Sequence, residues 1–123
     1  MEINEICLTE DIPVQITVYR EFDFESWPAT FTIEIKQGEE INTSLITIEM
    51  LKNNNFVFNG DKFFKDIKDY GCELYYDLRD GEFIIFKNRN KREQTKVSFK
   101  RILQVYKLQN ILKIYGFNFD FTV

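Results

Sequence analysis

The segment from Cys72 to Asn90 constrains the fold more than any other part of the chain. Two runs rich in aromatic and aliphatic residues flank Asp80-Gly81. This dipeptide favours a two-residue hairpin turn, because both residues tolerate positive φ. A two-residue turn would place Leu78 opposite Phe83, and it would set the register of every other pair in the hairpin.

The two faces of this hairpin differ in composition. One face is apolar and is predicted to point into the core; it carries Leu74, Tyr76, Leu78, Phe83 and Ile85. The other face is half apolar, so we expect a helix, another sheet or a partner to cover it. Its apolar members form a candidate contact face, namely Tyr75, Ile84 and Phe86.

The remaining sequence predicts a single α+β domain over residues 1–123. Alternating apolar and polar residues predict strands over 13–25, 31–36, 44–51, 56–58 and 116–123, with a break at 26–29. In the first strand the side chains expected to face the core are Val14, Ile16, Val18, Phe22 and Phe24. Helical spacing predicts short helices at 61–70 and 98–107, and residues 87–96 predict an exposed loop. The expected fold is a mostly antiparallel sheet of about six strands, with the Asp-Gly hairpin at its centre and two short helices.

Several classes of chemistry lack their usual residues in this chain. There is no histidine, which is the usual general base and the commonest metal ligand. The five glycines form no phosphate-binding motif, and Cys7 and Cys72 are too few for a structural zinc site. We therefore predict no catalytic residue, no metal and no cofactor. The two cysteines are expected to be free thiols, although a bridge between them stays open.

The sequence also bears on the location of the protein. It has no apolar run near the length of a membrane span, and its acidic N-terminus lacks the pattern of a signal peptide. A cytoplasmic protein without a membrane anchor is therefore expected.

Charge is divided unevenly along the chain. Residues 1–60 contain eleven acidic and three basic side chains, whereas residues 87–113 contain nine basic side chains and one acidic side chain. Such an asymmetry predicts that the two regions meet different partners or each other.

The acidic region contains candidate residues for binding a basic partner protein. They lie on predicted strand exteriors and in a turn, and they are Tyr19, Glu21, Asp23, Glu25, Glu34, Glu39 and Glu40. A row of carboxylates attracts basic side chains, although an ordinary solvated sheet face has the same composition. Trp27 is a residue type common in binding hot spots, and its alternative role is to fold back over the sheet edge.

The basic region contains a second candidate site. The predicted loop before the second helix carries the basic side chains Lys87, Arg89, Lys91, Arg92 and Lys96, of which the first four form the candidate patch. Such a cluster suits the phosphates of a nucleic acid, although a solubilising loop has the same composition. Nucleic acid is therefore the second candidate partner, after a basic protein.

Four features of the chain resemble the small immunity proteins of bacterial contact-dependent growth-inhibition systems. They are its size, its missing catalytic groups, its acidic and aromatic-rich predicted sheet, and its frequent Asn, Ile, Lys and Phe residues. The resemblance extends over the whole chain and implies a cytoplasmic antitoxin that inhibits a nuclease toxin by protein–protein binding. Phage-encoded inhibitors such as anti-CRISPR proteins are similar in the same respects.

A further resemblance covers only Val97–Tyr115. Its sequence, VSFKRILQVYKLQNILKIY, is similar to the last helix and following turn of anti-sigma-factor antagonists. The phosphorylatable serine that opens a helix in that family has no counterpart at 61–70.

Overall fold

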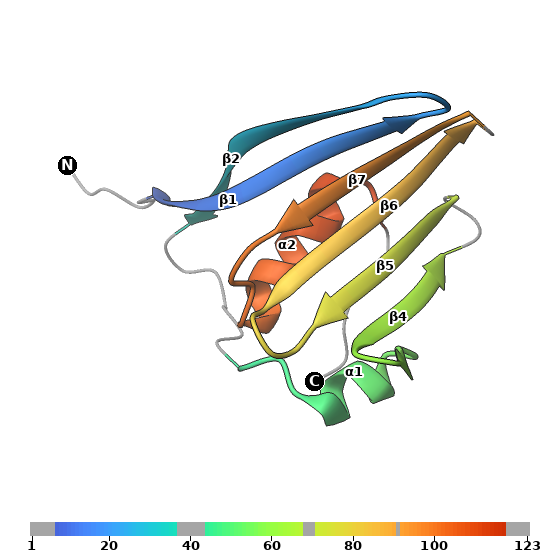
Figure 1. Cartoon of the computed structure of the whole chain (residues 1–123). Helices are drawn as coiled ribbons and strands as arrows, with labels where there is room; N and C mark the ends of the chain where they lie inside the picture. The colour runs from blue at the N-terminus through green and yellow to red at the C-terminus, as the bar shows by residue number, and fades with distance from the viewer. Residues whose placement is uncertain (1–6, 37–43, 68–70, 91, 118–123) are drawn as a thin grey trace.

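The computed structural model describes residues 7–36, 44–67, 71–90 and 92–117. In these ranges the chain forms one antiparallel sheet of seven strands and two helices (Figure 1). The elements are β1 (Cys7–Arg20), β2 (Phe24–Lys36), α1 (Ile48–Asn53), β3 (Val57–Asn59), β4 (Lys62–Ile67), β5 (Cys72–Asp77), β6 (Glu82–Asn90), β7 (Glu93–Phe99) and α2 (Val105–Ile114). The predicted α+β class with a mostly antiparallel sheet is confirmed, with seven strands in place of about six.

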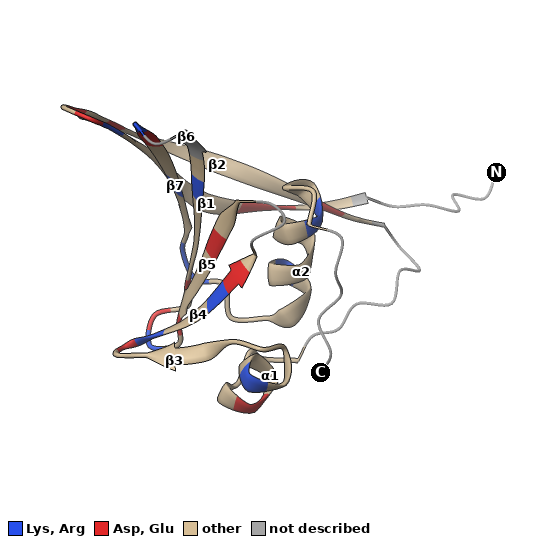
Figure 2. Ribbon diagram, turned by 90° about the vertical axis from the view of Figure 1, so that its right-hand side faces the viewer, with Lys and Arg blue, Asp and Glu red and all other residues tan. Residues whose placement is uncertain are grey.

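The order of strands in the sheet is β2-β1-β7-β6-β5-β4-β3. The N-terminal hairpin therefore joins the sheet at β7, where Val14 pairs with Phe99, rather than at the next strand along the chain. Both helices lie on one face, which we call the inner face, and the opposite face is the outer face (Figure 2). This arrangement leaves β2 and β3 as the two edge strands.

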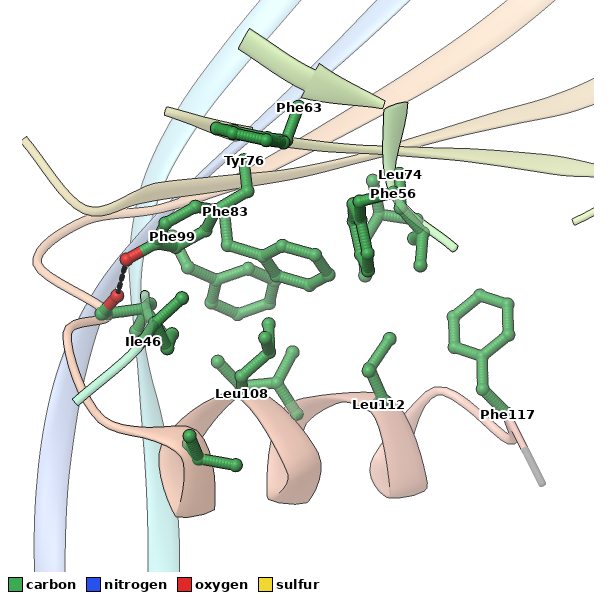
Figure 3. Close-up of a cluster of buried hydrophobic side chains, with 14 of the residues drawn as sticks. Ile46, Phe56, Phe63, Leu74, Tyr76, Phe83, Phe99, Leu108, Leu112 and Phe117 are labelled. Atoms are coloured by element: carbon green, nitrogen blue, oxygen red, sulfur yellow. Dashed lines mark hydrogen bonds between the residues drawn. The ribbon is translucent and has the colours of Figure 1, made fainter. Parts of the chain in front are cut away.

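The hydrophobic core lies between the inner face of the sheet and α2. The helix contributes four buried side chains, which are Val105, Leu108, Ile111 and Leu112. From the sheet, the rings of Phe83 and Phe99 are fully buried and stack 6.2 Å apart (Figure 3). The hydroxyl of Tyr76 donates a 2.6 Å hydrogen bond to the carbonyl of Ile102, and burial raises the pKa of Tyr76 to about 12.

A polar contact also joins the N-terminal hairpin to α2. Glu10 lies on the inner face of β1, where it forms an ion pair with Lys107 and accepts a 3.0 Å hydrogen bond from Tyr106. The hydrogen bond from Lys107 is the largest contribution to a lowered pKa of Glu10. The first half of β1 is thereby attached to the helix, while its second half continues toward the β1–β2 turn.

Two elements have the opposite secondary structure from that predicted. Residues 62–67 form β4 rather than a helix, because Phe63 and Ile67 face the core while Phe64 points to the outer face. Residues 48–53 form α1, which replaces the second half of the strand predicted over 44–51. Thr47 caps this helix, since its hydroxyl accepts a 3.2 Å hydrogen bond from the backbone N–H of Met50. Over such short segments, the spacing of the apolar residues fits the period of a helix as well as that of a strand.

The predictions for 87–107 were also wrong except at 105–107, which are helical as predicted. The expected exposed loop is the end of the β6–β7 hairpin, and β7 continues to Phe99 where a helix was predicted. Arg101 has a positive φ of 58°, which separates the strand from α2. The break predicted at 26–29 lies inside β2, and the predicted C-terminal strand lies outside the described residues except for Gly116 and the buried Phe117.

The register of the hairpin between β5 and β6 differs from the prediction. The connection contains four residues, 78–81, so Tyr76 pairs with Phe83 and Tyr75 with Ile84. The faces nevertheless stay as expected, because the register differs by two residues and side chains alternate with a period of two. Gly81 has a φ of 68°, and its carbonyl accepts a 2.7 Å hydrogen bond from the N–H of Ile102.

Candidate binding surface

The β1–β2 turn and the β6–β7 turn lie side by side at one end of the sheet, away from both helices (Figures 1 and 2). Four aromatic side chains are exposed at this end, and we call them the aromatic tip: Tyr19 (40% exposed), Phe22 (93%), Phe24 (66%) and Trp27 (45%). Large aromatic side chains are usually buried, and a cluster of exposed ones marks an interaction surface.

The aromatic tip presents side chains on both faces of the hairpin. Tyr19 and Phe24 pair across the two strands on the outer face, with ring centroids 6.1 Å apart. Trp27 pairs with Ile16 and therefore lies on the inner face. Phe22 lies in the turn itself, so a partner that surrounds the turn would meet aromatic surface from each side.

Two ion pairs connect the two hairpins beside the aromatic tip. Arg92 lies 3.6 Å from Glu21, and Arg20 lies 3.9 Å from Glu93. Arg20 also lies 3.8 Å from Glu25 within the β1–β2 hairpin. The acidic and basic regions of the sequence therefore meet each other at this end. These groups are well exposed, so each pair adds little stability, in the range of about 0–1 kcal/mol.

The predicted row of acidic side chains on one strand face does not exist. β1 ends at Arg20, whose N–H donates a 2.7 Å hydrogen bond to the carbonyl of Asp23, so the residues between them form the turn. Glu25 pairs with Val18 and thus lies on the opposite face from Tyr19.

The other predicted acidic residues are remote from the tip or cannot be described. Glu34 pairs with Thr9, ten residues along β1 from Tyr19, which corresponds to about 33 Å of strand. Glu39 and Glu40 lie outside the described residues.

The predicted basic patch is divided as well. Lys87 lies on the inner face, with its ammonium 5.2 Å from the ring centroid of Tyr115. Arg92 lies at the hairpin end in its contact with Glu21. Arg89 belongs to β6, and Lys91 lies outside the described residues. Lys87 and Arg92 therefore do not form one phosphate-binding surface.

The second predicted contact face is part of the outer face. Tyr75 lies between Phe64 and Phe86, with ring centroids 5.0 and 5.3 Å away, and Ile84 is buried beneath its neighbours. The ammonium of Lys96 lies 6.0 Å from the ring of Phe86. Burial, followed by the charge of Glu73 and the hydrogen bond to it, raises the pKa of Tyr75. Sequence reasoning missed Phe64, because it assigned that segment to a helix.

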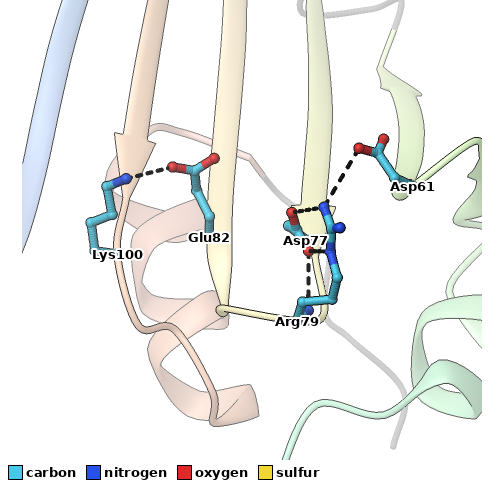
Figure 4. A network of polar contacts seen from close by, with 5 residues as sticks. All are labelled: Asp61, Asp77, Arg79, Glu82 and Lys100. Atoms are coloured by element: carbon cyan, nitrogen blue, oxygen red, sulfur yellow. Dashed lines mark hydrogen bonds and ion pairs between the residues drawn. The ribbon is translucent and has the colours of Figure 1, made fainter.

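A polar hollow of about 340 Å³ lies on the outer face between β2 and β6, and its lining includes Glu82, Ser98 and Lys100. Glu82 accepts hydrogen bonds of 2.8 Å from Lys100 and 3.0 Å from Ser98 (Figure 4 shows the contact with Lys100). Burial acts to raise the pKa of Glu82, but these two bonds lower it. The same contact raises the pKa of Lys100, so this lysine stays protonated and does not provide a base for Ser98.

The described residues offer few groups for redox or metal chemistry. Cys72 is buried, and burial raises the pKa of its thiol, with Lys87 acting in the opposite direction. In the described ranges no three His, Cys, Asp or Glu side chains lie together in a way that could hold a metal ion. None of the helices in these ranges is long and apolar enough to cross a membrane.

Comparisons with family models, with curated proteins and with solved structures found no match to this chain.

Proposed function

We propose that this chain is a small cytoplasmic binding protein that neutralises a partner protein by direct contact, in the manner of an immunity protein that inhibits a bacterial nuclease toxin. The observation that carries the proposal is the aromatic tip, whose four members are each at least 40% exposed. Trp and Tyr are enriched among the residues that dominate binding energy, because they bury a large area at a small cost in side-chain entropy.

The charge that supports a basic partner is the carboxylate of Asp23 in the β1–β2 turn, because Glu21 and Glu25 beside it are each paired with an arginine. A basic protein would be attracted to this end over a distance of about one Debye length, roughly 8–10 Å at physiological salt. The aromatic side chains would then provide the short-range contact that slows dissociation.

The position of the site supports inhibition by occlusion. The tip lies at one end of the sheet, away from both helices, and Phe22 in its turn is 93% exposed, so this end can cover a catalytic cleft of the partner. Blocking a catalytic cleft requires no catalytic group on the inhibitor. It requires an interface of ordinary size, about 800 Å² per partner, with a few anchor residues at its centre.

Affinity capture with three matched baits tests the proposal. We expect wild type and a Val57→Ser control to retain the same protein from an extract of the source organism, because the exposure of Val57 lies between those of Phe22 and Trp27 but Val57 lies in β3. The double variant Phe22→Ser/Trp27→Ser should retain at least about tenfold less, and the captured protein should lose its activity when wild type is added. Capture of no protein, or equal capture by all three baits, would contradict the proposal.

A further inference from the structure

A second hollow lies at the opposite end of the molecule from the aromatic tip. It has a volume of about 410 Å³ and is formed by α1, the β3–β4 hairpin and the β5–β6 connection. We call it the α1 groove, and its apolar lining consists of Ile48, Phe58, Phe63 and Leu78. The volume falls within the roughly 300–1,000 Å³ that is usual for small-molecule sites.

The walls of the α1 groove are apolar side chains that the fold leaves accessible. Phe63 is buried, and its ring lies 5.2 Å from that of Phe58, which is 57% exposed. Ile48 in the first turn of α1 is 48% exposed. An alkyl chain placed between these side chains would remove their apolar surface from water, which is favourable in proportion to the area covered.

The charged groups at the rim are arranged asymmetrically. The guanidinium of Arg79 lies 3.0 Å from Asp77 and 3.5 Å from Asp61, so two carboxylates already balance its charge (Figure 4). The hydrogen bond from Arg79 is the main cause of a lowered pKa of Asp77. Lys52 lies in the last turn of α1, and in the described part of the chain its ammonium forms no ion pair. Among the described residues, the rim therefore offers one cation that forms no ion pair, Lys52.

We propose that the α1 groove binds an anionic amphiphile of the medium-chain fatty acid class. The alkyl chain would lie against Phe58, Phe63 and Leu78, and the carboxylate would meet the ammonium of Lys52. The carboxylate of Asp61, which belongs to the same rim, contacts Arg79 and disfavours a second anion only on that side of the groove. This site is independent of the aromatic tip, so the inference does not depend on the proposed function.

Titration with decanoate, followed by calorimetry and by amide chemical shifts, tests the inference. We expect saturable one-to-one binding, with the largest shift changes in 48–58 and 78–79. The cation decyltrimethylammonium also has a ten-carbon chain but carries the opposite charge. It should bind more weakly by about tenfold, since Lys52 would repel its positive headgroup. Absence of saturable binding up to low-millimolar decanoate, equal binding of the two amphiphiles, or shift changes confined to another region would overturn the inference.

Two pairs of variants separate the groove from general effects of detergent-like molecules. Lys52→Gln should weaken decanoate binding about threefold to fivefold, whereas Lys113→Gln, which changes an exposed lysine in the last turn of α2, should leave it unchanged. Ile48→Asn should weaken binding about tenfold, whereas Leu45→Asn, at an exposed position outside the groove, should not. If Ile48→Asn fails to fold, Phe58→Asn takes its place. Equal affinity of the groove variants and their controls would overturn the inference.

Discussion

The two ends of this molecule both expose apolar side chains, but in different surroundings. At the aromatic tip, Phe22 and its neighbours lie beside charges of both signs, and Tyr19 lines a hollow of about 510 Å³ together with polar residues such as Arg20 and Arg92. At the other end, Phe58 and Ile48 line a hollow of about 410 Å³ with mostly apolar walls, and Lys52 at its rim forms no ion pair within the described part of the chain. An aromatic surface with many charged neighbours suits a partner protein, and a small apolar hollow beside one cation suits an alkyl chain that ends in a carboxylate. Similar exposed fractions can therefore serve different kinds of ligand, and the neighbouring side chains decide between them.

The largest expected effect comes from the core that connects the two ends. Phe83→Ala should lower the free energy of unfolding by about 3–5 kcal/mol, because it leaves a cavity beside the rings of Phe99 and Tyr76.

Two spectroscopic probes measure this loss and test whether the two ends unfold together. The only tryptophan, Trp27, lies in the aromatic tip, so its fluorescence reports on that end while far-UV circular dichroism reports on the whole sheet. Coincident denaturation curves are expected. Separate midpoints would mean that the tip unfolds independently and that the two ends are not one cooperative unit.

High pH should weaken the same core through Tyr76. Its pKa of about 12 in the folded protein exceeds the unfolded value near 10, so the folded state holds the proton more tightly. The contribution to stability is therefore complete below pH 10 and is lost as the pH rises from about 10 to 12, by roughly 2 kcal/mol. Burial also raises the pKa of Tyr115, which acts in the same direction.

Denaturation midpoints between pH 9 and 11.5 measure this effect. Tyr76→Phe should flatten the profile relative to wild type, because it removes the titrating hydroxyl and retains the ring. An identical slope in both proteins would assign the alkaline loss to other groups.

A glycine in the β5–β6 connection, near the α1 groove, should show the next largest effect. Gly81→Val should lower the free energy of unfolding by roughly 1–3 kcal/mol, because a β-branched residue resists a φ of 68°. An added Cβ would also lie 2.7 Å from Cδ2 of Leu103 and 3.2 Å from the backbone N of Ile102. Gly60→Val is the matched control, since Gly60 has a φ of 73° but open space around it. A larger loss for Gly60 than for Gly81 would show that packing against 102–103 is unimportant.

The smallest effect on stability is expected at the aromatic tip. Arg92→Glu replaces an ion pair with Glu21 by a repulsion between two exposed carboxylates, which should cost less than about 1 kcal/mol. Amide exchange at the two hairpin turns should nevertheless increase, because this contact joins them. An unchanged rate of amide exchange at both turns would show that backbone pairing alone holds the two hairpins together. The ion pairs would then not be needed to keep the tip rigid.

Local patterns in the sequence determined much of the sheet. Alternation identified the core of β1 and β2, and it assigned Tyr75, Ile84 and Phe86 to one face although the register was wrong by two residues. The reason is that the period of two is a property of each strand, whereas the register depends on the length of the turn. The unequal distribution of charge along the chain was also visible, and the sequence left open whether the two regions would meet each other.

The tertiary structure alone decided the short elements and the candidate sites. The apolar patterns of two segments, 62–67 and 48–53, suit a helix as well as a strand. Pairing with β5 selected a strand at 62–67, and capping by Thr47 favoured a helix at 48–53. The alternation predicted that Phe22 and Phe24 face the core, but the chain turns at 21–23, where Asp23 is the only typical turn residue, and this turn exposes both rings.

Long-range pairing explains the remaining difference. Addition of β1 beside β7 brings Glu21 to Arg92 across 71 positions of sequence, and no local pattern encodes that contact. The α1 groove likewise combines residues from 48 to 79, which come from α1, the β3–β4 hairpin and the β5–β6 connection, and no local pattern relates these three segments. The sequence therefore determined which side chains are apolar and how they alternate along each strand. Only the packing of distant segments decided which of them remain exposed together, because exposure depends on what covers a side chain rather than on its own chemistry.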